Sequence, residues 1–266
     1  MLDPQIFGTL TGWNRVWAIA AIHGERARLA GLHGELAERF QARDRVVYLG
    51  NYLGFGADVA GTMDELISFR RDLLAQPGMM PQDVVFLRGT QEEMWHKLLQ
   101  LQLAMNPPDV LVWMMEHGVT ATIQAYGGNP ADGQASARGG TVSLTRWTVK
   151  LRDAMYAHPG HRELIGQLKR ACVTDDGTLL FVHAGLDPER PLETQSDAFW
   201  WDPGGFSAMT QPYGKFRLVV RGFDPDRAGV RIGPFSATLD GGCGVDGPLV
   251  ACCFDRDGEL VDRIEA

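Results

Sequence analysis

The stretch RVVYLGNYLGFG, residues 45–56, is an apolar strand that runs directly into a glycine-rich loop. Four other short motifs also end apolar segments and also contain glycine: AIHG (21–24), RGTQE (88–92), VHAG (182–185) and RGFD (221–224). Ligand sites in open α/β sheets collect at the carboxyl ends of strands, where such loops converge. Glycine allows the backbone to turn sharply beside a ligand. The five motifs therefore predict one shared pocket.

The first hundred residues alternate between strand and helix patterns. Strands are expected at 15–22 and at the start of 45–56, and a strand, a turn and a helix are expected within 83–103. Apolar residues at helical spacing predict helices over 24–40 and 62–76. This βαβαβα order predicts an α/β sheet with right-handed crossovers.

The rest of the chain changes character twice. Residues 101–170 are rich in helix formers, with a Gly/Ala/polar stretch at 126–141 that is expected to be a mobile loop. From residue 171 the pattern turns to strands, expected within 178–186, 216–223, 230–242 and 248–255 and closing with 258–266. Neither an internal repeat nor a clear linker is visible, so we expect one domain over 1–266 with a helical cap inserted at about 101–170.

The composition of the chain indicates which classes of partner and which cellular compartment to expect. The chain has 266 residues, 45% of them apolar, and a net charge of −8, which argues against a nucleic-acid partner. No apolar run reaches the roughly 18 residues that a membrane span needs, and the first residues lack a signal-peptide pattern. Four cysteines without CxxC spacing favour a reduced, cytoplasmic chain.

The order of the motifs gives the pattern a family resemblance. The chain resembles the calcineurin-like metallophosphoesterases, in the branch of the PPP-type serine/threonine phosphatases and diadenosine tetraphosphate hydrolases. That family carries GDxHG, GDxxDRG, GNHE, VHAG and a late GH in this order, and here the matching stretches are AIHG, GNYLGFG, GTQE, VHAG and GF. The resemblance runs from about residue 14 to 260. It implies an α/β fold, a four-layer αββα sandwich of two mixed β-sheets.

The same resemblance implies two metal ions bound by six side chains, of which two are kept. Two ions this close need carboxylates to offset their charge, and neither carboxylate of the family is present here. The matching positions are Ala21, His23, Asn51, Thr90, His183 and Phe223, and together with Gln91 and Asp224 they define the predicted pocket. Only His23 and His183 keep the family's residue, so they are the candidates for a residual metal site.

The catalytic positions that the resemblance implies are replaced as well. The Asp and Arg of the DRG segment are Gly54 and Phe55, and a phenyl ring cannot make the bidentate contacts of a guanidinium. The proton-donating histidine is Gln91, whose amide does not titrate near neutral pH. Glu92, which orients that histidine in the family, remains.

We therefore interpret the chain as a pseudophosphatase that binds or regulates through a protein partner or a phosphorylated ligand, with no cofactor expected. An alternative is an active phosphoesterase with a rebuilt site, in which His23, His183, Asn51 and Asp224 hold a single Mn, Fe or Zn ion. A third interpretation is a structural subunit with an apolar surface at Trp200 and Trp201. Membrane and nucleic-acid partners are not expected.

Several other side chains leave alternatives open. An arginine among Arg88, Arg217 and Arg221 either binds phosphate without a metal or forms ordinary ion pairs. Phe55 and Phe223 are expected to pack together and fill the space of the family's metal ions. The histidines without a ligand pattern, for which solvent exposure is expected, are His96, His117, His158 and His161.

Overall fold

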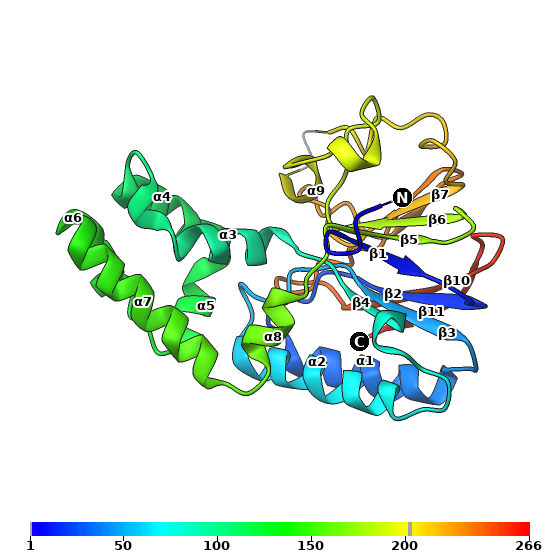
Figure 1. Cartoon of the computed structure of the whole chain (residues 1–266), viewed down its shortest axis with the longest axis horizontal. Coiled ribbons are helices and arrows are strands. Elements are labelled where there is room, and N and C mark those ends of the chain that lie inside the picture. The colour runs from blue at the N-terminus through cyan, green and yellow to red at the C-terminus, as the bar shows by residue number, and fades with distance from the viewer. Residues whose placement is uncertain (1, 202–203) are drawn as a thin grey trace.

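Two mixed β-sheets lie face to face at the centre of the computed structural model, which describes residues 2–201 and 204–266 (Figure 1). Within these residues the first sheet has the spatial order β1 (Phe7–Leu10), β5 (Ala171–Thr174), β6 (Leu179–Val182), β7 (Leu218–Arg221), β9 (Ser236–Thr238) and β8 (Arg231–Ile232). The second has the order β11 (Leu260–Glu265), β10 (Val250–Asp255), β2 (Arg15–Ile19), β3 (Asp44–Tyr48) and β4 (Val84–Phe86). Each sheet contains both parallel and antiparallel pairs.

Side chains that alternate along the strands of the second sheet form two cores. On β2, Val16 and Ala18 point into the core between the sheets, and Trp17 points to the outer face. On β10, Cys252 and Cys253 divide in the same way, as their adjacent positions predict. All four cysteines are buried free thiols.

Helices cover the outer face of the second sheet. The helices α1 (Arg26–Arg39) and α2 (Val59–Leu74) pack there against an apolar core (Figure 1). The outer face of the first sheet is covered mostly by irregular segments at 185–201 and 204–217, which contain the short helix α9 (Ala198–Trp201). The four layers are therefore present, and the layer over the first sheet is largely non-helical.

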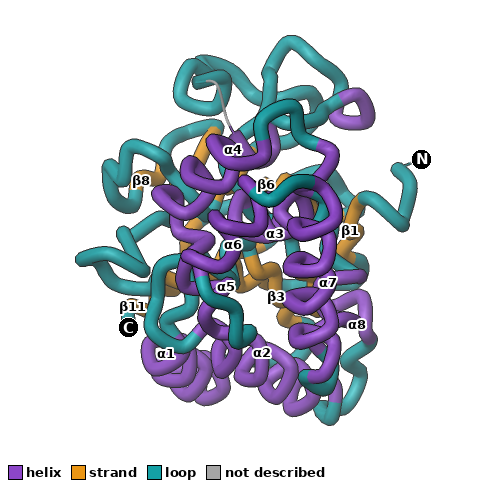
Figure 2. The backbone as a smooth tube through the Cα atoms, turned by 90° about the vertical axis from the view of Figure 1, so that its left-hand side faces the viewer, coloured by secondary structure: helices purple, strands orange, loops and turns teal. Residues whose placement is uncertain are grey.

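A cap of helices between Leu101 and Gly166 extends from the strands and lies in front of them in the second view (Figures 1 and 2). It follows α3 (Thr90–Leu98) and begins with a 3₁₀ turn at Leu101–Leu103. A kinked π-helical segment, Met115–Val119, joins its first two helices. The helices are α4 (Pro107–Met114), α5 (Thr120–Ala125), α6 (Pro130–Arg138), α7 (Thr141–Ala157) and α8 (His161–Gly166).

The prediction of a mobile loop over 126–141 is wrong, because α6 occupies most of it. Asn129 caps the helix by accepting a hydrogen bond from the Ala131 amide at 2.8 Å, and Pro130 follows as a favourable first residue. Gly133 lets α6 approach α7, since a Cβ at this position would lie 2.5 Å from the Trp147 ring.

The adjacent residues Asp64 and Glu65 of α2 each bind a buried histidine. Asp64 lies 3.0 Å from Nε2 of His161, whose Nδ1 is 2.9 Å from the hydroxyl of Tyr126 in the cap. Glu65 lies 2.7 Å from Nδ1 of His33 on α1. The expectation that His161 is exposed is therefore wrong, because this contact holds it inside the base of the cap.

Two strands have no counterpart in the sequence predictions. β1 and β5 are four residues each and pair in parallel with one another. Among residues 2–201 and 204–266, none of the helices combines the length and apolar character needed to cross a bilayer.

Candidate functional site

The five glycine-marked motifs meet at one edge of the sandwich. Backbone hydrogen bonds join them across the two sheets: the Ala21 amide donates to the Gly222 carbonyl at 3.0 Å, and the amides of Gly222 and Phe223 both donate to the His183 carbonyl at 3.0 Å. The amide of His23 donates to the Asn51 carbonyl at 2.6 Å. We refer to these connected loops as the site loops.

The side chain of Glu92 joins two of the site loops through hydrogen bonds to their backbone. Its buried carboxylate accepts hydrogen bonds from the backbone amides of Asn51, Tyr52, Leu53 and Gly89 at 2.8–3.0 Å. Burial raises the pKa of Glu92, and these four donors act in the opposite direction. The carboxylate that orients a histidine in the family resemblance thus supports the backbone here.

Asn51, at the position of the bridging carboxylate, has its side chain engaged by the protein. Its Oδ1 accepts a hydrogen bond from the Gln91 amide at 2.9 Å, and its Nδ2 lies 3.4 Å from Nε2 of His23. Asn51 and His23 both have positive φ, 56° and 57°, in the left-handed region that few non-glycine residues adopt. The site loops thus keep a tight conformation around neutral side chains.

Both ring nitrogens of His183 lie within hydrogen-bond distance of protein oxygen atoms. Its Nδ1 lies 2.6 Å from the Leu49 carbonyl and therefore donates, which leaves Nε2 of the neutral ring as an acceptor. The hydroxyl of Thr90 lies 3.0 Å from this Nε2 and 2.7 Å from the Trp200 carbonyl. Burial lowers the pKa of His183 to about 4, so the ring is neutral at pH 7.

His23 lies among aromatic rings. Phe55 and Phe223 make edge contacts with its imidazole at centroid distances of 5.4 Å and 5.7 Å. Burial, followed by the charges of His183 and Arg227, lowers the pKa of His23 to about 3. Its Nδ1 is buried without a hydrogen-bond partner among the described residues. The phenyl rings were expected to pack together, and the structure places an imidazole in contact with both.

The replaced catalytic positions form contacts with the cap. Gln91 donates from Nε2 to the His117 carbonyl at 2.8 Å. A Cβ at Gly54 would lie 2.5 Å from the Gln91 side chain, so the glycine makes room for the glutamine. The Phe55 ring lies against Gly118, where a Cβ would come within 2.7 Å of it.

The residues present do not fit the pair of metal ions that the family resemblance implies. Within residues 2–201 and 204–266, no three His, Cys, Asp or Glu side chains are grouped so that they could hold a metal ion. Asp224, the carboxylate expected in a rebuilt single-metal site, forms a buried ion pair with Arg221 at 3.0 Å and accepts the amides of Asp226 and Ala228. Asp240 accepts the amides of Asp224 and Gly242. The oxygen atoms of these two carboxylates are therefore already bonded to backbone amides and, for Asp224, to an arginine.

The three arginines with open roles are all in ion pairs. Arg88 pairs with Glu93 at 3.2 Å, Arg217 pairs with Glu259, and Arg221 pairs with Asp224. Trp200 is buried in the outer core of the first sheet and donates from its indole to the Arg88 carbonyl at 3.1 Å. Trp200 is therefore a core residue and not part of an exposed apolar surface, and Trp201 is half-buried beside it.

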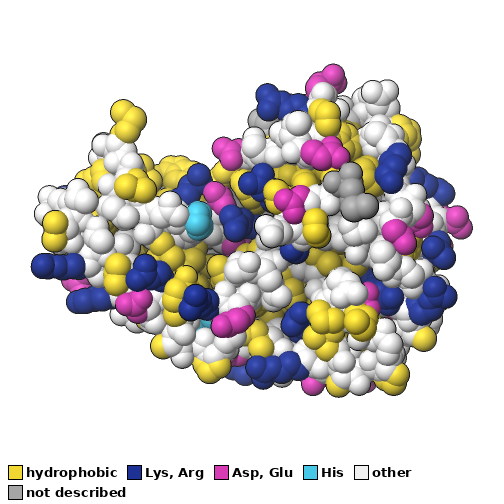
Figure 3. Space-filling model, in the orientation of Figure 1, with side chains coloured by type: hydrophobic (Ala, Val, Ile, Leu, Met, Phe, Trp, Pro, Cys, Tyr) yellow, Lys and Arg dark blue, Asp and Glu magenta, His cyan; other side chains and the backbone are white. Residues whose placement is uncertain are grey.

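A cavity of about 380 Å³ opens between the site loops and the cap. Of the predicted pocket residues, Thr90, Gln91 and Phe223 line it directly, together with Phe55. His23 and His183 lie behind Phe223, which contacts both rings. Figure 3 shows the surface hollowed between the cap and the sandwich. The aromatic residues that the cap contributes, Trp113 and His117, were not predicted as site residues.

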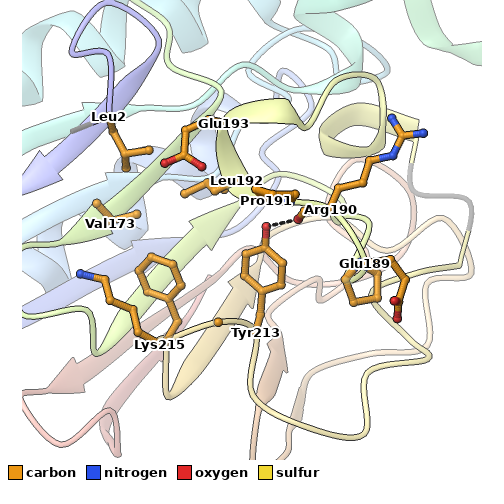
Figure 4. A pocket seen from close by; sticks show the side chains of 12 residues that line it. Leu2, Val173, Glu189, Arg190, Pro191, Leu192, Glu193, Tyr213 and Lys215 are labelled. Atoms are coloured by element: carbon orange, nitrogen blue, oxygen red, sulfur yellow. Dashed lines mark hydrogen bonds between the residues drawn. The ribbon is translucent and has the colours of Figure 1, made fainter.

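A second cavity, of about 590 Å³, lies elsewhere (Figure 4). It lies on the outer side of the first sheet and is lined by residues that include Val173, Tyr213 and Phe216. The Tyr213 hydroxyl donates to the Arg190 carbonyl at 2.6 Å at its edge. None of the five glycine-marked motifs lines it, so we place the candidate site at the smaller cavity.

Comparisons with solved structures agree with the fold. Neither protein-family models nor curated proteins give a match to the chain. Among solved structures, a candidate diadenosine tetraphosphatase is similar over 98% of both chains, with a TM-score of 0.56 and 19% identity. A serine/threonine phosphatase from Saccharomyces cerevisiae, with similarity to human PP5, is similar over 99% of this chain and 84% of its own, with a TM-score of 0.53 and 12% identity. A cold-active protein tyrosine phosphatase gives a TM-score of 0.51 and 14% identity over 98% and 81%. At these identities the likeness concerns the fold.

Proposed function

We propose that this chain, which has the calcineurin-like metallophosphoesterase fold, is a pseudophosphatase that binds a protein partner or a phosphorylated ligand without hydrolysing it. The proposal depends most on one observation. Side chains at the metal-ligand positions are hydrogen-bonded to their neighbours: Thr90 to the Trp200 carbonyl, and Asn51 to the backbone amide of Gln91. Side chains already engaged in this way do not present an anionic cage to divalent ions.

The catalytic step also lacks its groups. Gln91 cannot donate a proton to a leaving group near neutral pH, and Phe55 cannot clamp a phosphate. Loss of a single preorganised charge stabiliser lowers rates on the order of 10²–10³-fold. Losing the metal ions together with both of these groups is expected to remove measurable hydrolysis.

The cavity supports a binding role. Its volume of about 380 Å³ falls within the range of about 300–1,000 Å³ that is typical of small-molecule sites. It lies between two parts of the molecule, the site loops and the cap, so a ligand there contacts both. A binding protein could signal occupancy through this shared surface.

Two measurements test the proposal on the full chain. Protein expressed with Mn²⁺, and then freed of loosely bound ions, is analysed for Mn, Fe and Zn, and 4-nitrophenyl phosphate hydrolysis is followed with added Mn²⁺. We expect less than 0.1 metal equivalents per chain and no hydrolysis above the buffer rate. One or two tightly bound equivalents, with hydrolysis that is lost in His183→Ala, would overturn the proposal in favour of an active enzyme.

A further inference from the structure

The walls of the cavity are mainly aromatic and come from separate parts of the chain. Trp113 of α4 stacks on His117 at a centroid distance of 4.3 Å and an interplanar angle of 28°. Trp201 of α9 lies 6.0 Å from Trp113. Phe223 and Phe55 complete the rings on the side of the site loops. Trp113 and Phe55 are 42% and 39% exposed, so ring surface remains available in a cavity that protein surrounds.

Aromatic walls of this kind bind flat, unsaturated rings best. Indole and phenyl rings pair with other rings in offset or edge geometries, which contribute beyond the area they bury. The volume is at the small end of the range for ligand sites, which favours one or two fused rings over a peptide. The aromatic walls and the small volume of the cavity therefore favour a ligand with one or two flat rings, whatever its charge.

The charge that faces the cavity is positive. Arg227 is the Lys or Arg side chain that lines it, and Asp and Glu side chains are absent from its lining, as far as the chain is described. The ion pairs of the described residues do not include Arg227. Its charge is also one of the causes that lower the pKa of His23. The charge of Arg227 also acts to lower the pKa of Asp240, which burial raises, but no described carboxylate forms an ion pair with it, and a guanidinium whose donors are not paired in this way binds planar anions.

Resting on the proposed function, we infer that this cavity binds a small planar aromatic molecule that carries one anionic group. Trp113, Trp201 and Phe223 contact the ring, and Arg227 binds the anion. No metal ion takes part in the binding. The anionic group is a carboxylate, sulfonate or phosphate, which present similar oxygen atoms to a guanidinium.

A cationic ligand is the main competing class. Aromatic cages also bind quaternary ammonium groups through the faces of their rings. Such a cage is helped by a nearby carboxylate and opposed by an arginine. The described lining of this cavity has the arginine and lacks the carboxylate, so it favours the anion.

Isothermal titration of the full chain with four matched probes tests the inference. The probes are 2-naphthoate, neutral 2-naphthylmethanol, cationic trimethyl(2-naphthyl)ammonium and the saturated decahydro-2-naphthoate. We expect 2-naphthoate to bind at least tenfold more tightly than each of the others. Titration with 2-naphthalenesulfonate and 2-naphthyl phosphate then identifies the preferred anion. Tighter binding of the cation, or no binding of 2-naphthoate at 1 mM, would overturn the inference.

Paired variants locate the site. Arg227→Gln is expected to weaken 2-naphthoate at least tenfold and to leave 2-naphthylmethanol unchanged. The control Arg231→Gln removes an exposed arginine on β8 that does not line this cavity. Trp113→Ala is expected to weaken both probes, and Tyr156→Ala removes another exposed aromatic side chain as its control. Equal losses in test and control variants would contradict the assignment.

The outcomes separate this inference from the proposed function. If no metal is bound, nothing is hydrolysed and 2-naphthoate does not bind, the ligand class is wrong and the pseudophosphatase proposal stands. If 2-naphthyl phosphate is hydrolysed with Mn²⁺, the proposed function is wrong whatever the affinity for 2-naphthoate.

Discussion

The phenyl ring of Phe223 stacks on the imidazole of His183, with centroids 5.3 Å apart and planes 5° from parallel. In the family resemblance, position 223 belongs to a metal-ligating histidine. Here an apolar ring lies over a retained ligand and separates it from the cavity. The stacking explains how an imidazole can persist at this position without a metal ion.

Removal of the Phe223 ring is expected to expose His183. Phe223→Ala loses the stacking on His183 and the edge contact with His23, at a cost of about 1–3 kcal/mol for a partly buried ring. Water that reaches the imidazole is expected to raise the pKa of His183 from about 4 toward 6.5. Urea unfolding and histidine NMR titration measure the two effects. An unchanged pKa would show that burial comes from elsewhere.

The two buried histidines predict acid sensitivity. Their folded-state pKa values, about 3 for His23 and about 4 for His183, lie below the unfolded value of about 6.5. Their contribution is complete above pH 6.5 and is lost as the pH falls toward 4, because the unfolded chain takes up the protons first. Between pH 7.5 and 5 the unfolding free energy is expected to fall by on the order of 3 kcal/mol.

Urea titrations at several pH values measure this slope, and the double variant His23→Gln/His183→Gln is its control. The slope should become shallower in the variant. Some dependence should remain, because burial also lowers the pKa of His33 and His161. An identical slope in both proteins would show that other groups control the acid response.

Glu92 is expected to be essential for stability. Glu92→Gln replaces one acceptor oxygen by an NH₂ group that faces backbone amides, which leaves buried donors without partners at a cost of about 2–4 kcal/mol. The exposed Glu116→Gln is the matched control and should change the unfolding free energy by less than about 0.5 kcal/mol. Similar values for the two variants in urea unfolding would refute a supporting role for this carboxylate.

Chelation is expected to leave the fold unchanged. A metal ion bound only by the folded state adds about 2.7 kcal/mol at a hundredfold excess over its Kd, which is several degrees in melting temperature. EDTA should therefore shift the melting temperature by less than 1 °C, and added Mn²⁺ or Zn²⁺ should not raise it. A drop of several degrees on chelation, reversed by one metal ion, would contradict the proposed function.

Much of the fold follows from local patterns in the sequence. Apolar runs that end in glycine place β2, β3 and β6 and the loops that follow them, because strand period and turn chemistry are local properties. β1 and β5 are four residues each, and β1 pairs with β5 from the opposite part of the chain, which no local pattern predicts. The helix α6 depends on the approach of Gly133 to Trp147, which only the tertiary structure creates.

For the candidate site, too, the sequence predicts one part, and the other part depends on the tertiary structure. Which chemical groups are missing at positions 21, 51, 55 and 91 is evident from the residues themselves. What their replacements contact is not, since the bond from Gln91 to the His117 carbonyl depends on where the cap lies. Trp113 and Arg227 line the cavity because of how the cap and the loop after β7 are placed in the tertiary structure. Neither residue belongs to a sequence motif that would have marked it as a ligand-binding residue.

The neighbouring acids of α2, Asp64 and Glu65, reach two different parts of the molecule, through His161 at the base of the cap and His33 on α1. One rigid helix therefore acts as a common anchor. If the cap lifts away as a whole, the contact between His161 and Asp64 breaks. A rotation about that contact keeps it and widens the cavity most at the far end of the cap, where Trp113 lies.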